Sequence, residues 1–600
     1  MSARIQQAAP AGATPSAAWT EARVLRRVAL VAAAAAVVTR VPFAARRLWD
    51  HDSVQFALGV EKYDLAAHHP HPPGYPLSIA VLKLLAMLGV DSLHGMVALS
   101  ILATALGAAL IVPLTVRLAS AAAERVMPAA GHVGLAADAG LATDAGLGSG
   151  AGRASDAGVA GDASHGFGAR AVRAGALAAA LFVFNPLLWF YGELPLVYAV
   201  EGGMTVGLAY AALRMADGRG PYLAACAAFA LAGGVRPSTL VLLLPLFLLG
   251  AWHAWRRGAA AGTMAAGAAV GAAVGLAWLA PLLAAAGGLA AYRRIGSEHF
   301  SALLPYTSIL YGAGWKALAH NLTIMTKWFL QGLVPAALAL GALWLPFPRR
   351  RAAAGFRLVA AAWPWLAAWV VPPILFFALF HVTKAGYTLI YLPALLVAAS
   401  LLGAPAMAGR RGRRAAAAIL LAALTGAVLF LFGADRRPDQ PRALAVVRNE
   451  LNRAAITTYE RDLDALLAAL RRLPPSTTVL ATVELSGTGP AGPEGFLYPW
   501  QRHLQWYLPG YEVLHLVPEE GLVFVTRGHL PFHRERPRLE LPADTRQLAI
   551  VLSGPTGDRF PLSAWPLRRI GDTFYLVVVP IQEGLRLGPY TFAVPHRQAA

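Results

Sequence analysis

Long apolar runs alternate with short polar breaks between residues 28 and 433. A helix needs about 20 predominantly apolar residues to cross a hydrocarbon core, and most of these runs approach that length. The pattern predicts a polytopic α-helical membrane module with about eleven transmembrane helices. The predicted spans are 28–45, 93–120, 172–190, 196–213, 221–235, 237–254, 262–290, 322–346, 358–380, 387–405 and 415–433.

The apolar run at 77–90 is not counted as a span, because it is too short to cross and follows a proline cluster. We expect it to form a helix in the membrane interface. With that choice, the basic clusters fall in alternate loops, as they do on the cytoplasmic side of membrane proteins. The sequence therefore predicts a cytoplasmic amino terminus and an inner-membrane protein whose carboxy-terminal part is extracytoplasmic or periplasmic.

Residues 435–600 have a different character, since charges return and short alternating runs predict strands near 478–483, 522–526, 547–553 and 573–579. Helical spacing runs from 442 to 473. We expect an extracytoplasmic α+β domain here, and its aromatic stretch at 498–507 is the best candidate to contact the membrane module. The remaining predicted divisions are a disordered cytoplasmic tail (1–22), the membrane module (23–434), its first outer loop (46–92) and a low-complexity cytoplasmic insertion (121–170).

Composition agrees with this pattern. The chain is 57% hydrophobic and 14% charged, whereas about a quarter of residues are charged in typical soluble domains. The net charge of +19 is carried by arginines in short loops, so we assign it to topology and anionic lipid headgroups rather than to nucleic acid. A single cysteine, Cys226, excludes an intramolecular disulfide and any multi-cysteine metal site.

The predicted topology gathers ionisable residues from five loops on the outer face. Charge at membrane depth is expensive, so such a cluster indicates a functional site. Carboxylates come from the first two loops and cations from the last three, which suits a reaction on a phosphate-bearing lipid. The five loops are 50–75, 189–201 with Glu193, the break at Arg236, 292–321 with Arg293 and Arg294, and 381–387 with Lys384.

Several motifs resemble the GT-C glycosyltransferases, and among bacterial proteins the protein O-mannosyltransferase and RgtA/B/C/D-like groups. The resemblance covers about residues 24–433. It rests on Asp52 just after the first helix, His-Pro-Pro-Gly-Tyr-Pro at 71–76, Asn-Pro-x-x-Trp at 185–189 followed by Glu193 and Tyr198, Gly-x-Arg-Pro-Ser-Thr at 234–239, and Gly-Tyr-x-Leu-x-x-Leu-Pro at 386–393.

The resemblance implies an inverting enzyme that moves a sugar from a polyprenyl-phosphate donor lipid to an extracytoplasmic acceptor, a protein or a cell-envelope glycan or lipid. Asp52 then falls on the position of the catalytic base, with Asp50 as second candidate. Donor phosphate is expected at Arg293, Arg294, Lys384, His381 and Arg236, and acceptor or sugar at His71, Tyr75, Glu193 and Tyr191. Ser53 stands where the family often has an acidic residue, so no metal site is predicted, while a divalent cation cofactor stays open.

Each assignment has a simpler alternative. Asp52 could cap a helix that starts at Ser53, and Asp50 could be a solvated residue. Arg293 and Arg294 could be interfacial anchors. Zinc at the histidines of 68–71 is disfavoured because prolines extend that backbone. For the whole chain, the alternatives are a noncatalytic membrane scaffold or a transporter for envelope polysaccharide assembly.

Overall fold

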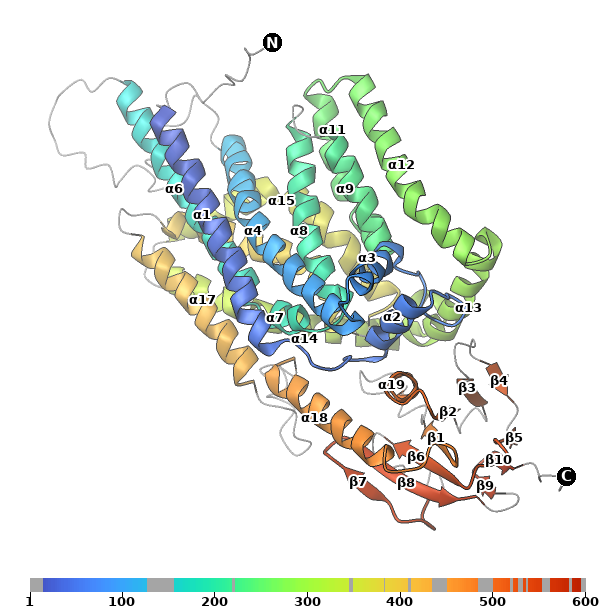
Figure 1. Cartoon of the computed structure of the whole chain (residues 1–600). Helices are drawn as coiled ribbons and strands as arrows, with labels where there is room; N and C mark the ends of the chain where they lie inside the picture. Colours follow the sequence, from blue (N-terminus) through green and yellow to red (C-terminus); the bar gives the residue numbers. More distant parts are fainter. Residues whose placement is uncertain are drawn as a thin grey trace.

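The structure is a computed structural model. It describes residues 15–126, 156–217, 222–344, 349–382, 384–407, 412–433, 451–483, 500–517, 522–526, 533–535, 538–552, 562–581 and 585–594. A layer of long helices forms one part of the molecule, and the carboxy-terminal sheet with its helices forms the other (Figure 1).

Every predicted apolar run coincides with a helix or a pair of helices. Two short helices, α2 (His51–Glu61) and α3 (Pro76–Met87), lie between α1 and α4, and α13 (Leu289–Thr307) precedes α14. The others are α1 (Pro15–Arg40), α4 (Ser92–Val126), α6 (Asp156–Val183), α7 (Pro186–Glu193), α8 (Val197–Ala216), α9 (Tyr222–Val235), α10 (Pro237–Leu242), α11 (Leu244–Arg256), α12 (Ala261–Ala285), α14 (Gly314–Trp344), α15 (Arg349–Leu379), α16 (Leu392–Gly403) and α17 (Arg413–Leu431).

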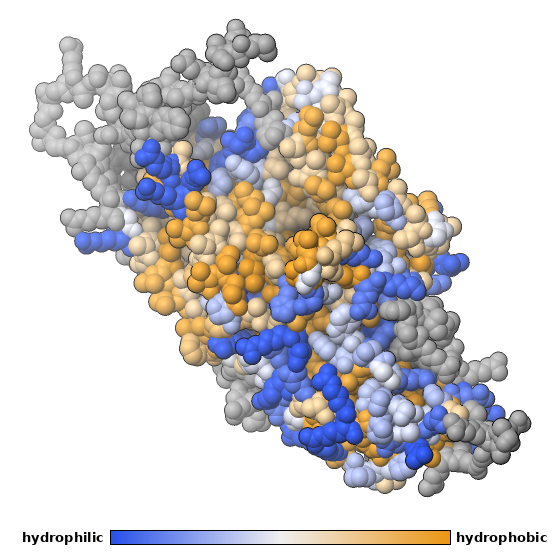
Figure 2. All heavy atoms as spheres, viewed as in Figure 1, coloured by the Kyte–Doolittle hydropathy of each residue, from blue (hydrophilic) through white to orange (hydrophobic). Residues whose placement is uncertain are grey.

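Five helices in the described residues are long and apolar enough to cross a membrane: α4, α12, α14, α15 and α17. A sixth span is obtained if α6 and α7, which meet at a bend of 54°, are counted as one. Figure 2 shows apolar side chains gathered over the helical layer and polar ones over the carboxy-terminal part. These features indicate an integral membrane protein; the predicted count of about eleven spans stays a prediction.

Some predicted boundaries differ from the structure. Helix α1 begins at Pro15, inside the segment expected to be a disordered tail, and residues 1–14 lie outside the described part. The low-complexity insertion expected at 121–170 is helical at both ends, because α4 continues to Val126 and α6 starts at Asp156. Alanine-rich sequence explains these extensions, since alanine has the highest helix propensity.

Helices α4 and α8 pack closely and hold the turn that follows α7. A Cβ atom on Gly203 would lie 2.1 Å from the Ala103 carbonyl oxygen, so this approach requires glycine. The Ser100 hydroxyl in α4 donates to the carbonyl oxygens of Leu194 and Leu196 at 3.1 and 2.9 Å. These bonds fix the connection from α7, which carries Tyr191 and Glu193, to α8.

The carboxy-terminal domain has α18 (Arg453–Leu470) and α19 (Gln501–Tyr507) with a seven-stranded sheet of order β4-β3-β2-β1-β6-β8-β7. Strand β1 lies between β2 and β6 and is parallel to both, while the outer pairs are antiparallel. A small sheet has the order β5-β10-β9. The strands are β1 (Thr478–Val483), β2 (Glu512–Val517), β3 (Leu522–Thr526), β4 (His533–Glu535), β5 (Arg538–Glu540), β6 (Gln547–Leu552), β7 (Arg568–Ile570), β8 (Phe574–Pro580), β9 (Leu585–Leu587) and β10 (Tyr590–Ala593).

This domain is bonded to the segment 46–92 of the membrane module. The backbone N–H of Leu48 donates to the Tyr507 hydroxyl at 2.9 Å, and the Tyr459 hydroxyl donates to the Leu48 carbonyl at 3.1 Å. Arg502, which is 1% exposed, donates to the Ala67 carbonyl at 2.9 Å and lies 3.0 Å from His69 Nε2. A buried guanidinium on two loop partners fixes the loop against the domain.

We expect Arg502→Met to loosen this loop, because Met keeps the apolar stem but leaves the Ala67 carbonyl without its donor. An unsatisfied buried group costs about 1 to 3 kcal/mol, so local opening should become at least about fivefold more frequent. Hydrogen exchange of the His69 amide, which is bonded to the Asp64 carbonyl at 2.8 Å, measures this. Arg568→Met, at an exposed arginine of β7, is the matched control, and equal exchange in both variants would contradict the role given to Arg502.

Candidate active site

The first turn of α2 places two carboxylates side by side. Asp50 is the residue that caps this helix: one of its oxygens accepts from the backbone N–H groups of Asp52 and Ser53 at 3.0 and 3.2 Å. The alternatives in which Asp52 caps a helix from Ser53 and Asp50 is solvated are therefore wrong, since α2 begins at His51 and the Asp50 side chain is 4% exposed. Capping by Asp50 leaves the Asp52 carboxylate available for other contacts.

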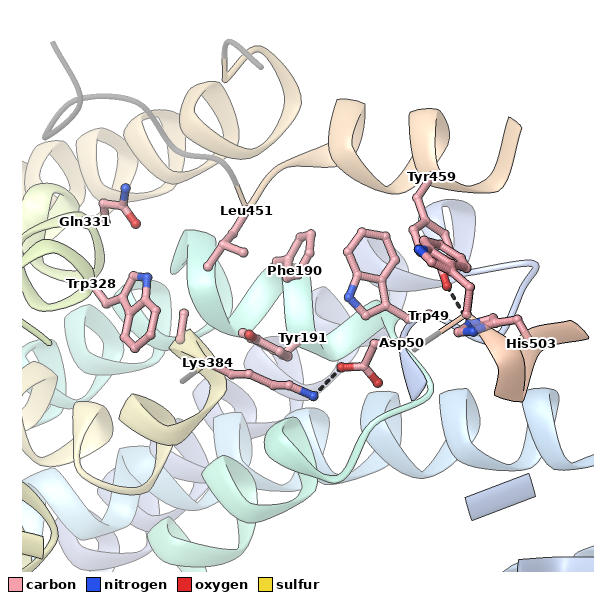
Figure 3. A pocket seen from close by; sticks show the side chains of 12 residues that line it. Trp49, Asp50, Phe190, Tyr191, Trp328, Gln331, Lys384, Leu451, Tyr459 and His503 are labelled. Carbon is pink, nitrogen blue, oxygen red and sulfur yellow. Dashed lines mark hydrogen bonds and ion pairs between the residues drawn. The ribbon is translucent and has the colours of Figure 1, made fainter. Parts of the chain in front are cut away.

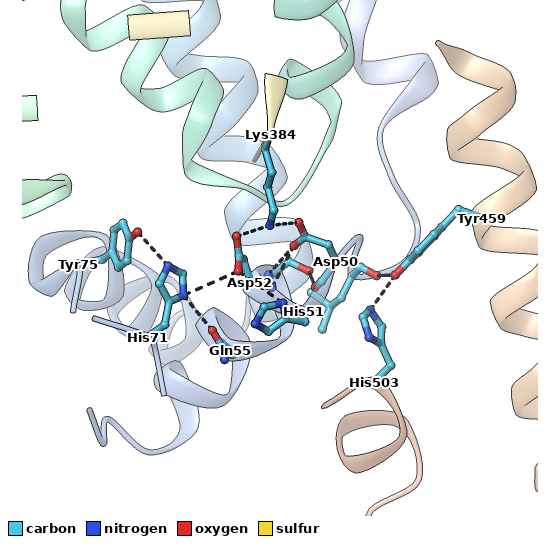
Figure 4. Close-up of polar contacts among 11 residues, drawn as sticks. Asp50, His51, Asp52, Gln55, His71, Tyr75, Lys384, Tyr459 and His503 are labelled. Atoms are coloured by element: carbon cyan, nitrogen blue, oxygen red, sulfur yellow. Dashed lines mark hydrogen bonds and ion pairs between the residues drawn. The ribbon is translucent and has the colours of Figure 1, made fainter. Parts of the chain in front are cut away.

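Lys384 binds both carboxylates at once. Its ammonium donates to Asp50 Oδ2 and to Asp52 Oδ2 (Figure 4). Lys384 lies just before the 3₁₀ helix η4 (Ala385–Ile390), so the ion pair joins two segments more than 300 residues apart. With two carboxylates and one ammonium, the cluster has a net charge of −1. All three side chains are at most 15% exposed.

The second oxygen of Asp52, Oδ1, makes no hydrogen bond within the described chain. It lies 3.7 Å from His51 Nδ1 and 3.9 Å from His71 Nδ1. His71 also lies 2.8 Å from Gln55 Oε1 and 3.0 Å from the Tyr75 hydroxyl. An imidazole that donates from Nδ1 to Gln55 and accepts at Nε2 from Tyr75 satisfies both contacts.

Burial and charge shift these groups in different directions. Burial lowers the pKa of His51 to about 4 and that of His71 to about 3, so both rings are neutral at neutral pH. Burial raises the pKa of Asp50 above its ordinary value despite Lys384. Burial acts on Asp52 in the same sense, but opposing contributions, the largest from the Lys384 ammonium, outweigh it and the pKa of Asp52 is lowered. Asp52 is therefore the more strongly ionised carboxylate of the pair.

The other predicted cations lie elsewhere or have partners. Arg236 is 2.6 Å from Glu201 and lies over the rings of Tyr198 and Tyr387 at 5.0 and 5.2 Å. Its charge is thus already compensated. Arg293 and Arg294 are exposed on α13, where no ion pair links them to the aspartates in the described chain. His381 packs near the Tyr387 ring, with the centroids 5.9 Å apart.

Glu193 is fully buried at the end of α7, where the counter-charge comes from Arg40. Neither side-chain oxygen of Glu193 has a hydrogen-bond partner among the described residues. Arg40 itself donates to the Val183 carbonyl at 2.5 Å and to the Thr39 hydroxyl at 2.7 Å. This arrangement separates Glu193 from the Lys384 cluster. Sequence reasoning overlooked Arg40, although an arginine that ends an apolar helix needs a carboxylate or carbonyl partner when it is buried.

A cavity of about 220 Å³ opens beside Asp50 and Lys384, between the helical module and the carboxy-terminal domain (Figure 3). Tyr191, one of the predicted sugar-binding residues, contributes to its wall, and His71 and Tyr75 do not. The sequence analysis did not single out Trp49 or Trp328. The lining residues are Trp49, Asp50, Phe190, Tyr191, Trp328, Gln331, Lys384, Ala385, Leu451, Tyr459, Trp500 and His503.

The residues present do not fit a divalent cation between the two aspartates. Lys384 already donates to both carboxylates at the position such an ion would take. In the part of the chain that the structure describes, no group of three or more His, Cys, Asp and Glu side chains is arranged to hold a metal.

The chain resembles known proteins only in its fold. No protein-family model matches the chain, and no curated protein matches it. Two crystal structures of ArnT from Cupriavidus metallidurans, one bound to undecaprenyl phosphate and one in the apo state, are similar at TM-scores of 0.43 and 0.40. Their identities are 14% and 13%, and each comparison covers 94% of this chain and 98% of the ArnT chain. Scores at this level do not assign the chain to a family.

We expect Lys384→Met to destabilise the protein strongly at pH 7, by about 3 to 5 kcal/mol, because it leaves two buried carboxylates without a cation. The loss should shrink on acidification. Without Lys384 the pKa values of both carboxyls in the folded state should exceed their unfolded values, so the folded state takes up protons first and gains stability as pH falls. Thermal unfolding at pH 7 and pH 5 measures the difference.

Lys62→Met is the control, since this exposed lysine lies at the end of the same helix. A Lys384→Met variant that unfolds at the wild-type temperature at both pH values would show that the ammonium does not stabilise the aspartate pair.

Proposed function

We propose that the protein is an inverting GT-C-type glycosyltransferase that moves a sugar from a polyprenyl-phosphate carrier to a hydroxyl of an extracytoplasmic acceptor. The observation that carries the proposal is the buried Asp50–Lys384–Asp52 cluster, of which Asp50 and Lys384 line an open cavity. It supplies a carboxylate for an acceptor proton and a cation for a departing phosphate. The motif resemblance, which includes Asp52 and the segment at 386–393, supports the same reaction.

Asp52 acts as general base. Its Oδ1 accepts no hydrogen bond from the described residues, and the two histidines beside it are neutral, so neither competes for the carboxylate as a cation. The acceptor hydroxyl loses its proton to Asp52 as its oxygen forms the bond to the anomeric carbon. The bond from that carbon to the carrier phosphate oxygen breaks with inversion. A positioned base contributes about 10² to 10⁴ in rate.

Lys384 stabilises the phosphate that leaves. Negative charge develops on that phosphate in the transition state, and an ammonium in a partly buried site stabilises it more than it stabilises the bound donor. In the free protein Lys384 is held by the two aspartates and lowers the pKa of Asp52. When donor phosphate draws the ammonium toward itself, the Asp52 carboxylate becomes a stronger base. Donor binding thereby prepares the base for the acceptor.

Asp50 is a positioning residue in this scheme. One of its oxygens caps α2 and the other holds Lys384, so it orients both the base and the cation. The outward orientation of this site follows the predicted topology, with a cytoplasmic amino terminus. Arg293 and Arg294, exposed on α13, stay candidates for capturing donor phosphate at the entrance. Tyr292 joins α13 to the first loop through a bond to the Pro73 carbonyl at 3.2 Å.

The test supplies polyprenyl-phosphate sugars and a cell-envelope extract to membranes that contain the wild type or Asp52→Asn. Carrier consumption and label transferred to any acceptor are both measured. We expect Asp52→Asn to lose at least about a hundredfold in transfer, because the amide cannot accept the proton. The identity of the labelled acceptor then defines the substrate class.

Asp91→Asn is the control, because Asp91 is an exposed carboxylate just before α4 and its contacts are with His94 rather than with the cluster. Full transfer activity in Asp52→Asn would show that another carboxylate is the general base. If the wild type consumes no carrier across a broad panel of donors, the proposed glycosyltransferase activity is wrong and a noncatalytic scaffold is favoured.

A further inference from the structure

The cavity wall beyond Asp50 is an aromatic surface built from both parts of the molecule. Trp49 comes from the membrane module, and Tyr459 and Trp500 come from the carboxy-terminal domain. The Trp49 and Tyr459 ring centroids are 4.4 Å apart, and the Tyr459 and Trp500 rings are stacked with centroids 5.5 Å apart. In Figure 3 the rings of Trp49 and Tyr459 lie together on the side away from Lys384. The three rings of Trp49, Tyr459 and Trp500 form an aromatic wall.

The aromatic wall is fixed in place by polar bonds rather than by packing alone. The Tyr459 hydroxyl donates to the Leu48 carbonyl at 3.1 Å and lies 2.7 Å from His503 Nε2. Trp49 packs edge-on against Phe190, with centroids 5.4 Å apart. Rings held from several sides present a preorganised face, which lowers the entropy cost of binding a ligand.

Polar groups surround this face. Within the described chain, the indole N–H groups of Trp49 and Trp328 have no hydrogen-bond partner. Gln331 and the Tyr191 hydroxyl line the same space, and Asp50 with Lys384 closes one end. A hydrophobic core would be filled to close packing with apolar atoms, whereas this space is open and has hydrogen-bonding groups at its edges.

Aromatic faces bordered by amides, indole N–H groups and a carboxylate match the chemistry of a pyranose. A sugar ring presents C–H groups on its faces, which stack on aromatic rings, and hydroxyls at its rim, which hydrogen-bond in its plane. The cavity of about 220 Å³ is below the roughly 300 to 1,000 Å³ of sites for drug-sized ligands. One ring fills it, and a longer glycan would extend out of it.

We propose that this cavity is a subsite for a pyranose ring of the acceptor, held between the membrane module and the carboxy-terminal domain. The inference rests on the proposed function. The acceptor is favoured over the donor sugar because two of the three rings belong to a domain beyond the apolar helical layer, whereas the carrier lies in lipid. The carboxy-terminal domain thereby becomes an acceptor-binding domain.

The direct test measures sugar binding without catalysis. Full-length protein in nanodiscs, which avoids sugar-headed detergents, is mixed with methyl pyranosides of glucose, galactose, mannose and N-acetylglucosamine. Saturation-transfer NMR should show transfer to at least one of them. The signal should survive in Trp49→Phe, which keeps an aromatic face, and fall at least about fivefold in Trp49→Leu. Trp315→Leu, at a tryptophan that is 77% exposed in α14, is the control and should match wild type.

Competition separates the two sources of a sugar ring. A polyprenyl-phosphate sugar added in excess should leave the pyranoside signal in place if the subsite belongs to the acceptor. Displacement by the donor would assign the cavity to the donor sugar and overturn the proposal. Equal signals in Trp49→Leu and Trp49→Phe, or no signal for any pyranoside, would overturn it as well.

Failure of the subsite and failure of the proposed function give different results. If pyranosides bind in a Trp49-dependent way but no carrier is consumed, sugar binding stands and glycosyl transfer fails. If transfer occurs while Trp49→Leu and Trp49→Phe have the same KM for acceptor, transfer stands and the subsite fails. If both are right, the KM for acceptor should rise at least about fivefold in Trp49→Leu relative to Trp49→Phe.

Discussion

The candidate site depends on one ion pair network, in which the Lys384 ammonium lies between Asp50 and Asp52. Two adjacent carboxylates in a buried position repel each other and lose hydration, so they stay ionised only beside a cation. The cation comes from the far end of the membrane module, just before η4, while the carboxylates begin α2. The packed helices between them therefore serve to bring these segments together. A local change at either end would leave unpaired charge in the interior.

The carboxy-terminal domain contributes to the same site rather than standing apart from it. Two of its tyrosines bond both backbone polar groups of Leu48, two residues before Asp50. Arg502 holds the loop that carries His71 on the other side of α2. The chain that presents the aspartates is thus secured from both directions. Such supporting hydrogen bonds to the neighbouring backbone keep the aspartates in place and leave their carboxylates available to bind other groups.

The sequence predicted the helices well because their signal is local. Every apolar run became helical, and strands β1 and β3 have the predicted limits, since alternation and β-branched residues mark them. The membrane topology also selected Asp50, Asp52 and Lys384 as residues of one face. The periodicity could not reveal the separate roles of these three residues, because those roles depend on contacts between distant segments.

Three particular residues illustrate this limit. Arg236 was expected at donor phosphate but is bound to Glu201, and no spacing rule links residues 35 positions apart in sequence. Glu193 was expected near sugar but lies with Arg40 inside the protein. Trp49 was not singled out from the sequence, because only the position of the carboxy-terminal domain reveals its ring as part of a cavity.

The shared use of Leu48 has a consequence for how such chains can be recombined. Because one residue of the first loop is bonded to both α18 and α19, the carboxy-terminal domain is not an interchangeable module. A chimaera with a foreign domain would have to carry matching partners for residues 46–49 and for the Ala67–His69 turn. Changes in acceptor preference between related chains would then be found as paired substitutions, one in the first loop and one in the terminal domain.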